Sequence, residues 1–342
     1  MVRQGLAGPP FASAADVVER LLAVQAQDPR GFRLAVRSRS AGLTAVDVER
    51  ALNDGRLVVG WLNRGTLHLV RAEDYRWLHD LTTPQLRTSN GTRLRQCGVA
   101  HDQARKAVGL IAAAVKANGP LTRGALRARL DAAGIPTAGQ ALVHLLFAAA
   151  LAGRIVRGPL HGREQSFVAP EQWLPTTETL DHDEALALLA RRYLEGHAPA
   201  SAHDLARWAG ITLGAARRAF ASIAAETADA GEGRARLSHQ SPALERQEPK
   251  LLGAFDPLLL GWTSRVSVVG AAHASVITTN GLFRPFALVD GRAVATWRIA
   301  ADTVEIDPLE RISEADSRAL RDDAADVRRF LSGTATRSGQ QR

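Results

Sequence analysis

The feature that most constrains the fold is a repeated order of predicted elements, in which helices precede two short strands. In the first copy, helices from residue 14 and over 45–52 precede strands at 57–62 and 66–70, which the turn Asn63-Arg64-Gly65 joins. The same order returns about every 80 to 90 residues without obvious sequence identity. A helix over 74–81 follows the first hairpin, and the second copy has helices over 102–117, 122–132 and 137–151, the last with Thr137 as its expected cap, before strands at 154–157 and 164–168. The third copy has helices over 183–194, 201–209 and 212–225, followed by a wing tip at 231–234. Because helices followed by a hairpin make a winged helix-turn-helix, the pattern predicts three stacked winged modules.

After Lys250 the residue pattern changes from helical periodicity to short runs that are typical of strands. These runs lie at 265–269, 274–278, 286–289, 293–299 and 303–306, and Asp290-Gly291 is a strong hairpin-turn signal. A small β-barrel or curled sheet is therefore expected, followed by a charged helix over 313–331 and a loose tail over 332–342. The predicted fold class is mainly α with β, with tandem winged helix-turn-helix modules. The predicted divisions are residues 1–98, 99–175 and 176–248 for the modules, 249–312 for the β region and 313–342 for the terminal helix and tail.

The first predicted helix ends in a pair of glutamines. Ser13 is its expected N-cap, with Asp16 three residues on, and an aliphatic stripe follows. Gln25 continues that stripe, so an amide stands where the pattern calls for an aliphatic side chain. Gln27 follows where the helix is expected to run out before Pro29, because the residue ahead of a proline avoids the α region. Two amides at a helix end are candidates for lining a pocket.

The second strand of the first hairpin carries Thr66 and His68 on its polar face. Both are candidates for the same pocket as the glutamines. These residues can also have purely structural roles. Glutamine near a helix end commonly bonds to local backbone, and His68 can be a solvated residue of the wing. Asp28 is expected to act at a helix end or turn, and Trp61 to be a core residue.

Composition narrows the class of function without fixing it. A net charge of +8 and a pI near 10.7 favour a polyanionic partner, although the excess of arginine and alanine is also typical of a GC-rich genome. The single cysteine, Cys97, excludes an intrachain disulfide and a multi-cysteine metal site, and fits a reducing cytoplasm. The pairs His101-Asp102 and His182-Asp183 lack metal-ligand spacing. No apolar run approaches the length of a membrane span, and phosphate-loop and Rossmann glycine motifs are absent.

Several stretches together resemble the winged-helix DNA glycosylases of the AlkZ/YcaQ family. The similarity extends over roughly residues 11 to 310, and its most specific part is the hairpin motif. In the AlkZ-like subgroup the catalytic motif is Gln-x-Gln, whereas the YcaQ-like subgroup ends it with Asp. Gln25-Ala26-Gln27 matches the first kind, and Asp28 is only its neighbour. The stretches are 24–29 (Val-Gln-Ala-Gln-Asp-Pro), 61–70 (Trp-Leu-Asn-Arg-Gly-Thr-Leu-His-Leu-Val), 251–261 (Leu-Leu-Gly-Ala-Phe-Asp-Pro-Leu-Leu-Leu-Gly), 280–285 (Asn-Gly-Leu-Phe-Arg-Pro), 288–292 (Leu-Val-Asp-Gly-Arg) and 296–298 (Thr-Trp-Arg).

The resemblance implies a monofunctional DNA glycosylase that excises cationic alkylated purines carrying N7 or N3 adducts. It also allows the unhooking of bulky adducts or interstrand crosslinks, in DNA repair or in self-resistance. The chemistry of the pair agrees, because a neutral amide is no general base but can hold a water by hydrogen bonds. A base alkylated at a ring nitrogen is already cationic and leaves without protonation. We assign Gln27 to positioning the attacking water, and Gln25 to holding that water or the sugar-phosphate.

The expected partner is double-stranded DNA that contains alkylated bases, bound by a monomer in the cytoplasm at the nucleoid. No cofactor and no metal is implied. The alternative is a non-catalytic winged-helix regulator, which needs the same basic modules but is indifferent to Gln25 and Gln27. The residues expected to contact DNA or the lesion are Arg64, Thr66, His68, Arg284, Trp297 and Arg298.

Overall fold

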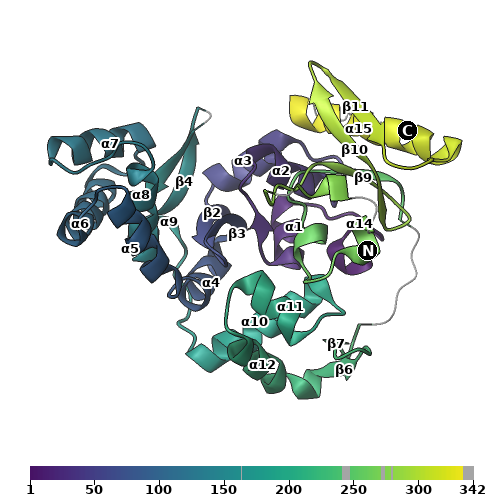
Figure 1. Ribbon diagram of the computed structural model, residues 1–342, viewed down its shortest axis with the longest axis horizontal. Coiled ribbons are helices and arrows are strands. Elements are labelled where there is room, and N and C mark those ends of the chain that lie inside the picture. The colour runs from purple at the N-terminus through teal and green to yellow at the C-terminus, as the bar shows by residue number, and fades with distance from the viewer. Residues whose placement is uncertain (163, 241–246, 271–273, 279, 334–342) are drawn as a thin grey trace, which may run out of the picture. The chain divides into compact units, whose positions relative to one another are not determined.

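The computed structural model describes residues 1–162, 164–240, 247–270, 274–278 and 280–333 (Figure 1). The chain divides into two compact units, and each is described by itself. The first contains residues 1–49, 186–208 and 212–342, and the second contains residues 50–185 and 209–211. The chain thus leaves the first unit within its first helices and returns to it from residue 186 onward, apart from residues 209–211. The module and domain boundaries expected from the sequence remain predictions.

The N-terminal part of the first unit is helical. Ser13 caps α1 as predicted, because its Oγ accepts from Asp16 N at 3.2 Å and the Asp16 carboxylate accepts from Ser13 N at 3.0 Å. The prediction that this helix runs on to the glutamines is wrong, as described below. The elements are the 3₁₀ turn η1 (Val2–Gln4), α1 (Ala14–Leu21), the two-residue strand β1 (Val24–Gln25), α2 (Pro29–Arg37) and α3 (Ala45–Asn53), whose last residues belong to the second unit.

The second unit begins with the predicted hairpin. Strands β2 (Leu57–Leu62) and β3 (Thr66–Arg71) pair antiparallel from Leu57↔Arg71 to Leu62↔Thr66. Asn63 and Gly65 take the positive φ values of 49° and 82° that the tight turn requires. The hairpin and its turn are therefore confirmed. The short turn η2 (Ala72–Asp74) and helix α4 (Tyr75–Thr82) follow, close to the helix predicted after the hairpin.

The rest of the second unit repeats helices and a hairpin. The helix predicted from Thr122 begins at Arg123, with Thr122 as its N-cap. Thr137 is not the cap that the sequence predicts, because its hydroxyl bonds to Asp131 and the next helix begins only at Ala141. The helices pack around aliphatic side chains that include Ile111, Leu130 and Leu145. The elements are α5 (Leu86–Gln96), α6 (His101–Asn118), α7 (Arg123–Ala132), α8 (Ala141–Leu151), β4 (Val156–His161), β5 (Glu164–Val168) and α9 (Pro170–Trp173).

A third set of helices and a hairpin returns the chain to the first unit. The last of these helices is predicted from Thr212 and begins at Leu213, with Thr212 as its N-cap. The predicted hairpin tip at 231–234 lies between two three-residue strands that pair from Thr227↔Leu237 to Asp229↔Ala235. The elements are α10 (His182–His197), α11 (Ala202–Ala209), α12 (Leu213–Ser222), η3 (Ala224–Glu226), β6 (Thr227–Asp229) and β7 (Ala235–Leu237).

The C-terminal β region is an open sheet. Strands β8 (Lys250–Leu252), β9 (Phe286–Val289), β10 (Arg292–Ala300) and β11 (Thr303–Pro308) form an antiparallel sheet in the order β11-β10-β9-β8. The expected alternative of a curled sheet thus fits better than a barrel, since β8 and β11 are unpaired edges within the described residues. Asp290 and Gly291 have φ of 46° and 77°, which confirms the predicted hairpin turn between β9 and β10.

Two predicted strands in this region are wrong. The valine-rich stretch expected at 265–269 is the helical turn α14 (Val266–Val269), and the stretch expected at 274–278 contains the 3₁₀ turn η4 (Ala274–Val276). One turn each can bury Val268, Val269 and Val276 against the sheet core, which overrides their β preference. Pro257–Leu260 forms α13, and α15 (Glu314–Ser332) is the predicted last helix, capped by Ser313. Most of the predicted tail lies outside the described residues.

Among the helices of the described ranges, none combines the length and the apolar character needed to cross a bilayer.

Candidate active site

The two glutamines lie in a short extended segment between helices, which corrects the prediction of a helix end. Helix α1 stops at Leu21, and Leu22 leaves the helix with a φ of 63°. Val24 and Gln25 are then extended, and Pro29 begins α2 rather than ending α1. The helical spacing of Gln25 from Leu21 was therefore coincidental. Proline suits the first position of a helix because it lacks the N–H that would be unpaired there.

Asp28 is the N-cap of α2, which fits the structural role expected for it. Its carboxylate accepts a hydrogen bond from the backbone N–H of Gly31, and its own carbonyl accepts from Phe32. Gln27 is thus the residue directly before the capped start of a nine-residue helix. The backbone dipoles of α2 give this end a partial positive charge, which favours an anionic group nearby.

The two amides differ in exposure, but neither has a hydrogen-bond partner in the described part of the chain. Gln25 is 8 % exposed, between the buried Val24 and Ala26, whereas Gln27 is exposed. Within the described residues, neither side chain makes a hydrogen bond, so the interpretation that they only satisfy local backbone is not what the structure shows. Both amides keep their donors and acceptors available for another molecule.

The first turn of α2 is held against residues 251–261, a second stretch that carries the family resemblance. A Cβ on Gly31 would lie 2.4 Å from the carbonyl oxygen of Ala254, and a Cβ on Gly253 would lie 2.9 Å from the Cβ of Leu34. Only glycine permits this approach of two backbones. The contact fixes the helix that starts directly after Gln27, so the two stretches meet in one unit.

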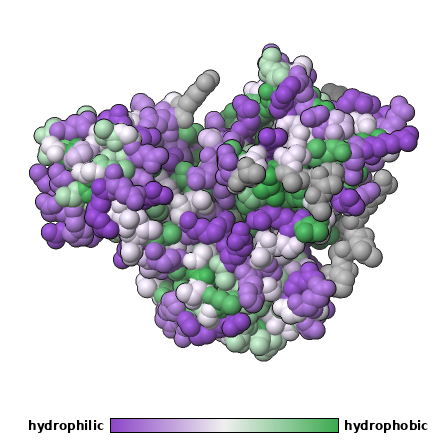
Figure 2. All heavy atoms as spheres, in the orientation of Figure 1, coloured by the Kyte–Doolittle hydropathy of each residue, from purple (hydrophilic) through white to green (hydrophobic). Residues whose placement is uncertain are grey.

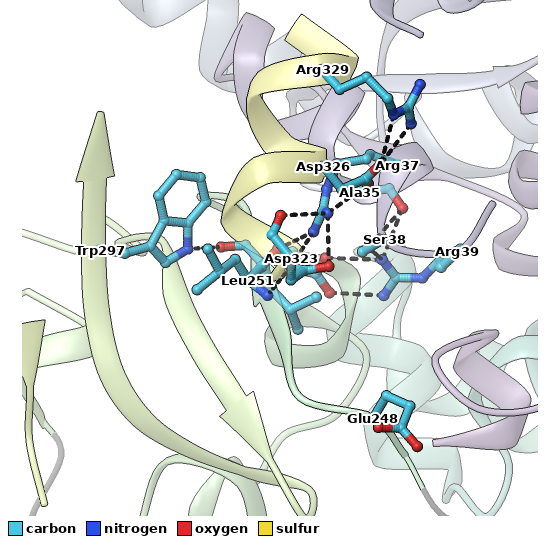
Figure 3. A network of polar contacts seen from close by, with 12 residues as sticks. Ala35, Arg37, Ser38, Arg39, Glu248, Leu251, Trp297, Asp323, Asp326 and Arg329 are labelled. Atoms are coloured by element: carbon cyan, nitrogen blue, oxygen red, sulfur yellow. Dashed lines mark hydrogen bonds and ion pairs between the residues drawn. The ribbon is translucent and has the colours of Figure 1, made fainter. Parts of the chain in front are cut away.

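A buried polar network holds the other end of α2 (Figure 3). Arg37 donates to Asp323 at 2.9 Å, to Asp326 at 3.0 Å and to the carbonyl of Leu251 at 2.7 Å. Asp323 also accepts from Leu251 N at 2.7 Å, so α15 and β8 share the same arginine. Burial opposes the charge of Arg37, but the two carboxylates raise its pKa above the ordinary value. The network joins α2 to the C-terminal elements of its unit.

A second buried ion pair lies beside the first. Arg39 donates to both carboxylate oxygens of Asp256, at 2.9 and 2.8 Å, and neither side chain is exposed. Arg39 also donates to the backbone carbonyls of Gln4 and Ala35. A bidentate pair with further hydrogen bonds is the geometry in which a buried ion pair is compensated. Together the two arginines anchor α2 and thereby the segment that precedes it.

In the second unit, the structure brings Thr66 and His68 together and buries the imidazole. His68 is 3 % exposed, its Nδ1 lies 3.0 Å from the carbonyl oxygen of Thr66, and the interpretation as a solvated wing residue is wrong. Burial and the nearby charge of Arg64 lower the pKa of His68 to about 3, so the imidazole is neutral near pH 7. The Thr66 hydroxyl is buried and lacks a hydrogen-bond partner in the described part of the chain. Arg64 is exposed at the turn.

The three residues predicted in the C-terminal region lie in different surroundings. Trp297 is 4 % exposed and donates its indole N–H to the carbonyl of Leu252 at 2.9 Å, so it packs in the core (Figure 3). Its expected contact with DNA has no structural support. Arg298 is exposed but ion-paired with Glu305 on the neighbouring strand, at 2.8 Å. Arg284 is exposed, and only its backbone is seen to bond.

One residue that the sequence analysis missed lies next to the glutamine pair. Arg30 occupies the first turn of α2, is exposed, and has no ion-pair or hydrogen-bond partner for its side chain in the described ranges. An arginine in the first turn of a helix adds to the partial positive charge there. The Asp-Pro helix start before it was the available signal. No cluster of three or more His, Cys, Asp or Glu side chains that could hold a metal ion occurs among the described residues.

Comparisons with known proteins agree on one family. Residues 18–330 match the family model described as "DNA glycosylase AlkZ-like". An interstrand DNA cross-link repair glycosylase of Streptomyces sahachiroi is 28 % identical over 355 aligned positions, which cover 96 % of this chain and 94 % of the relative. The solved structure of the S. sahachiroi DNA glycosylase AlkZ superposes with a TM-score of 0.78 at 25 % identity, over 98 % of this chain and 95 % of that chain.

Proposed function

Because this chain belongs to the AlkZ-like DNA glycosylases, we propose that it hydrolyses the N-glycosidic bond of cationic N7- or N3-alkylated purines in duplex DNA. Gln25 and Gln27 are the catalytic pair in this proposal. The observation that carries it is that both amides, in a segment fixed by α2, have no hydrogen-bond partner within the described residues. The alternative of a non-catalytic regulator gives these free amides no role.

The chemistry of an amide sets the substrate class. Hydrolysis passes through a sugar with oxocarbenium character while the base departs. An unmodified purine has to be protonated to leave well, and a glutamine has no acidic proton to give. A purine alkylated at N7 or N3 already carries the positive charge and needs only a placed water. A pair of glutamines is adequate for placing this water, but not for protonating an unmodified base.

The two glutamines have different roles in the proposal. Gln27 is exposed, so its amide oxygen accepts a hydrogen bond from the attacking water and orients that water toward the anomeric carbon. Gln25 is almost buried and therefore more rigid, which suits it to hold the same water or the sugar-phosphate. The positive end of α2 and the guanidinium of Arg30 are suited to hold the phosphate beside the lesion.

The proposed contacts with DNA follow the exposure of each predicted residue. Arg64 and Arg284 are exposed and suited to phosphate contacts. The neutral His68 and the unpartnered Thr66 hydroxyl offer hydrogen bonds to a nucleotide rather than charge. Arg298 has to leave Glu305 before it can bind a phosphate. Trp297 stays in the core.

The name of the S. sahachiroi relative extends the proposal to interstrand crosslinks. A crosslink formed through purine N7 or N3 leaves each attached base cationic, so the same water-positioning pair suffices to unhook it. We propose unhooking as a second activity of the same site, acting in DNA repair or in self-resistance.

The test compares lesions that differ in charge. Duplexes that carry one 7-methylguanine, one hypoxanthine or one N7-linked interstrand crosslink are incubated with the protein and heated in alkali to cleave abasic sites. We expect cleavage with the two cationic lesions and none with neutral hypoxanthine. Cleavage of hypoxanthine at a similar rate would contradict the substrate class, and no cleavage of any lesion would contradict the proposed function.

A further inference from the structure

The positive charge of the chain is concentrated in one stretch of the second unit. Residues 81–160 contain eleven Lys and Arg against two Asp and Glu, an excess of nine, while the whole chain carries +8. The rest of the chain is therefore close to neutral. The stretch begins with α5, whose eleven residues contain Arg87, Arg93 and Arg95 and no carboxylate. The predictions from the sequence assigned neither an element nor a role to this helix.

Helix α5 shows the solvent a polar face and buries little. Asn90 and Leu94 are its buried residues, and the Asn90 amide is bonded to His144 of α8. The remaining surface carries arginine, hydroxyl and amide groups, and the part of the molecule where Figure 1 shows α6 and α7 is covered largely by hydrophilic side chains in Figure 2. A helix that exposes so many donors and no acid is poorly explained by packing alone.

A cavity of about 490 Å³ lies between α5, α6 and α8, and its lining has a distinct chemistry. Arg87, Arg95 and Arg105 line it together with His101, and its floor is aliphatic, including Leu94 and Val108. No Asp or Glu is among its lining residues. A hollow that combines one sign of charge with low-dielectric walls focuses its electrostatic potential outward.

The three arginines lack the counter-charges that other exposed arginines have. In the described part of the chain, Arg87 donates to the carbonyl of Leu151 at 3.2 Å, Arg95 to the hydroxyl of Thr92 at 3.1 Å, and Arg105 has no polar partner. By contrast, several exposed or half-buried arginines elsewhere are paired with carboxylates. Such pairs are Arg191 with Glu226, Arg234 with Glu232, Arg292 with Glu310 and Arg298 with Glu305.

We propose that this arginine-lined hollow on α5 and α6 is a binding surface for the phosphate backbone of duplex DNA. Guanidinium groups match phosphate oxygens in bidentate geometry, and the hydroxyl of the exposed Thr88 on α5 adds a neutral donor. Such contacts carry no sequence information. The surface binds duplex DNA whether or not it is damaged, and its role in repair rests on the proposed function.

The test measures how salt changes the affinity for undamaged DNA. A 20-base-pair duplex is titrated by fluorescence anisotropy between 50 and 200 mM KCl with the wild type and with Arg87→Gln/Arg95→Gln/Arg105→Gln. Each phosphate contact contributes about 0.9 to the slope of log K against log salt, so the triple variant should lose about 2.7. Its affinity at 100 mM KCl should fall on the order of 100-fold.

Two control variants separate charge from folding. Arg191→Gln/Arg234→Gln/Arg292→Gln removes the same charge from arginines that are paired with carboxylates, and should keep the wild-type slope. Arg87→Lys/Arg95→Lys/Arg105→Lys keeps the charge of the hollow and should restore most of the slope. The proposal is overturned if the glutamine triple of the hollow binds DNA like the control triple at Arg191, Arg234 and Arg292. It is also overturned if the lysine triple of the hollow binds as weakly as the glutamine triple of the hollow.

Catalysis is read separately, so that the two proposals fail in different ways. At enzyme concentrations that saturate a 7-methylguanine duplex, the glutamine triple should release the base at the wild-type single-turnover rate, within about threefold. A loss of binding without a loss of saturated rate supports the surface alone. If the wild type releases no base from any lesion, the proposed function fails, while the slope comparison still decides the surface.

Discussion

Replacement of Gly31 by alanine tests whether the first turn of α2 is fixed by its backbone contact with Ala254. In an unhindered helix, alanine in place of glycine adds about 0.5–1 kcal/mol of stability. At Gly31 the new Cβ would lie 2.4 Å from the carbonyl oxygen of Ala254, and that oxygen belongs to backbone that cannot rotate away. Restoring a normal contact needs a separation of roughly 1 Å, and overpacking of this kind costs about 1–3 kcal/mol.

The assay compares Gly31→Ala with Gly109→Ala, because a Cβ at Gly109 of α6 would meet nothing within 4 Å. Urea unfolding followed by tryptophan fluorescence should show Gly31→Ala destabilised by about 1–2 kcal/mol and Gly109→Ala stabilised by about 0.5–1 kcal/mol. The rate of 7-methylguanine release should also fall for Gly31→Ala, on the order of 10- to 100-fold, because the displaced turn follows Gln27 directly. If Gly31→Ala is as stable and as active as Gly109→Ala, the reasoning is refuted.

Two further predictions concern buried charges. Arg39→Met leaves the Asp256 carboxylate buried without its partner, and should cost about 3–5 kcal/mol in urea unfolding. Arg39→Met/Asp256→Asn should recover part of that loss, and no recovery would contradict the assignment to an unpaired charge. Burial lowers the pKa values of His68 and His197 to about 3 and about 4, below the ordinary value of 6.5 that they have in the unfolded chain. The unfolded chain therefore binds more protons than the folded protein between these pH values, so the free energy of unfolding is greatest above pH 6.5 and falls as the pH is lowered toward 4 and 3. Stability should therefore fall with a slope of up to about 2.7 kcal/mol per pH unit between pH 6.5 and 4, and His68→Gln should halve that slope. Resonances of the His68 and His197 imidazoles that titrate near pH 6.5 in the folded protein would contradict this.

Local signals predicted much of the fold. Ser13 caps the helix that the sequence assigned to it, because a side-chain oxygen before a helical pattern satisfies N–H groups that the helix leaves free. Asp290-Gly291 likewise forms the expected turn, since its positive φ values suit these two residue types. The cap predicted at Thr137 is wrong, because its hydroxyl bonds to Asp131 instead. A local signal therefore indicates a cap only where no other partner competes for the side chain.

The misread stretches have identifiable physical causes. Asp28-Pro29 is both a way to end one helix and a way to begin the next, and the structure uses it to begin α2. Helix α5 has too few apolar residues to give a helical pattern, and is held instead by packing and by the bonds of Asn90 to α8. The valines of α14 favour a strand locally, but burial against the sheet core decides.

The proposed catalytic pair was identified by resemblance, but its position between two helices was not predicted. The Gln25 amide would point in a different direction at the end of a helix than in the extended segment before α2. The helix ends early because Leu22 has a positive φ, and leucine is not a residue type that predicts a positive φ. The support of the pair was also hidden. Arg37 and Asp323 are 286 residues apart, and a pairing over such a separation is set by the complete fold.

The central claim is that Gln27 positions the attacking water, and its most direct test is Gln27→Ala on a duplex with one 7-methylguanine. Under single-turnover conditions the wild type should release the base, as read by strand cleavage in hot alkali. The variant should be at least about 100-fold slower, in line with the removal of one positioned polar group from an active site. Its affinity for the same duplex should stay within about threefold, because an exposed neutral side chain contributes little to binding. Equal rates of release by the two proteins would contradict the account.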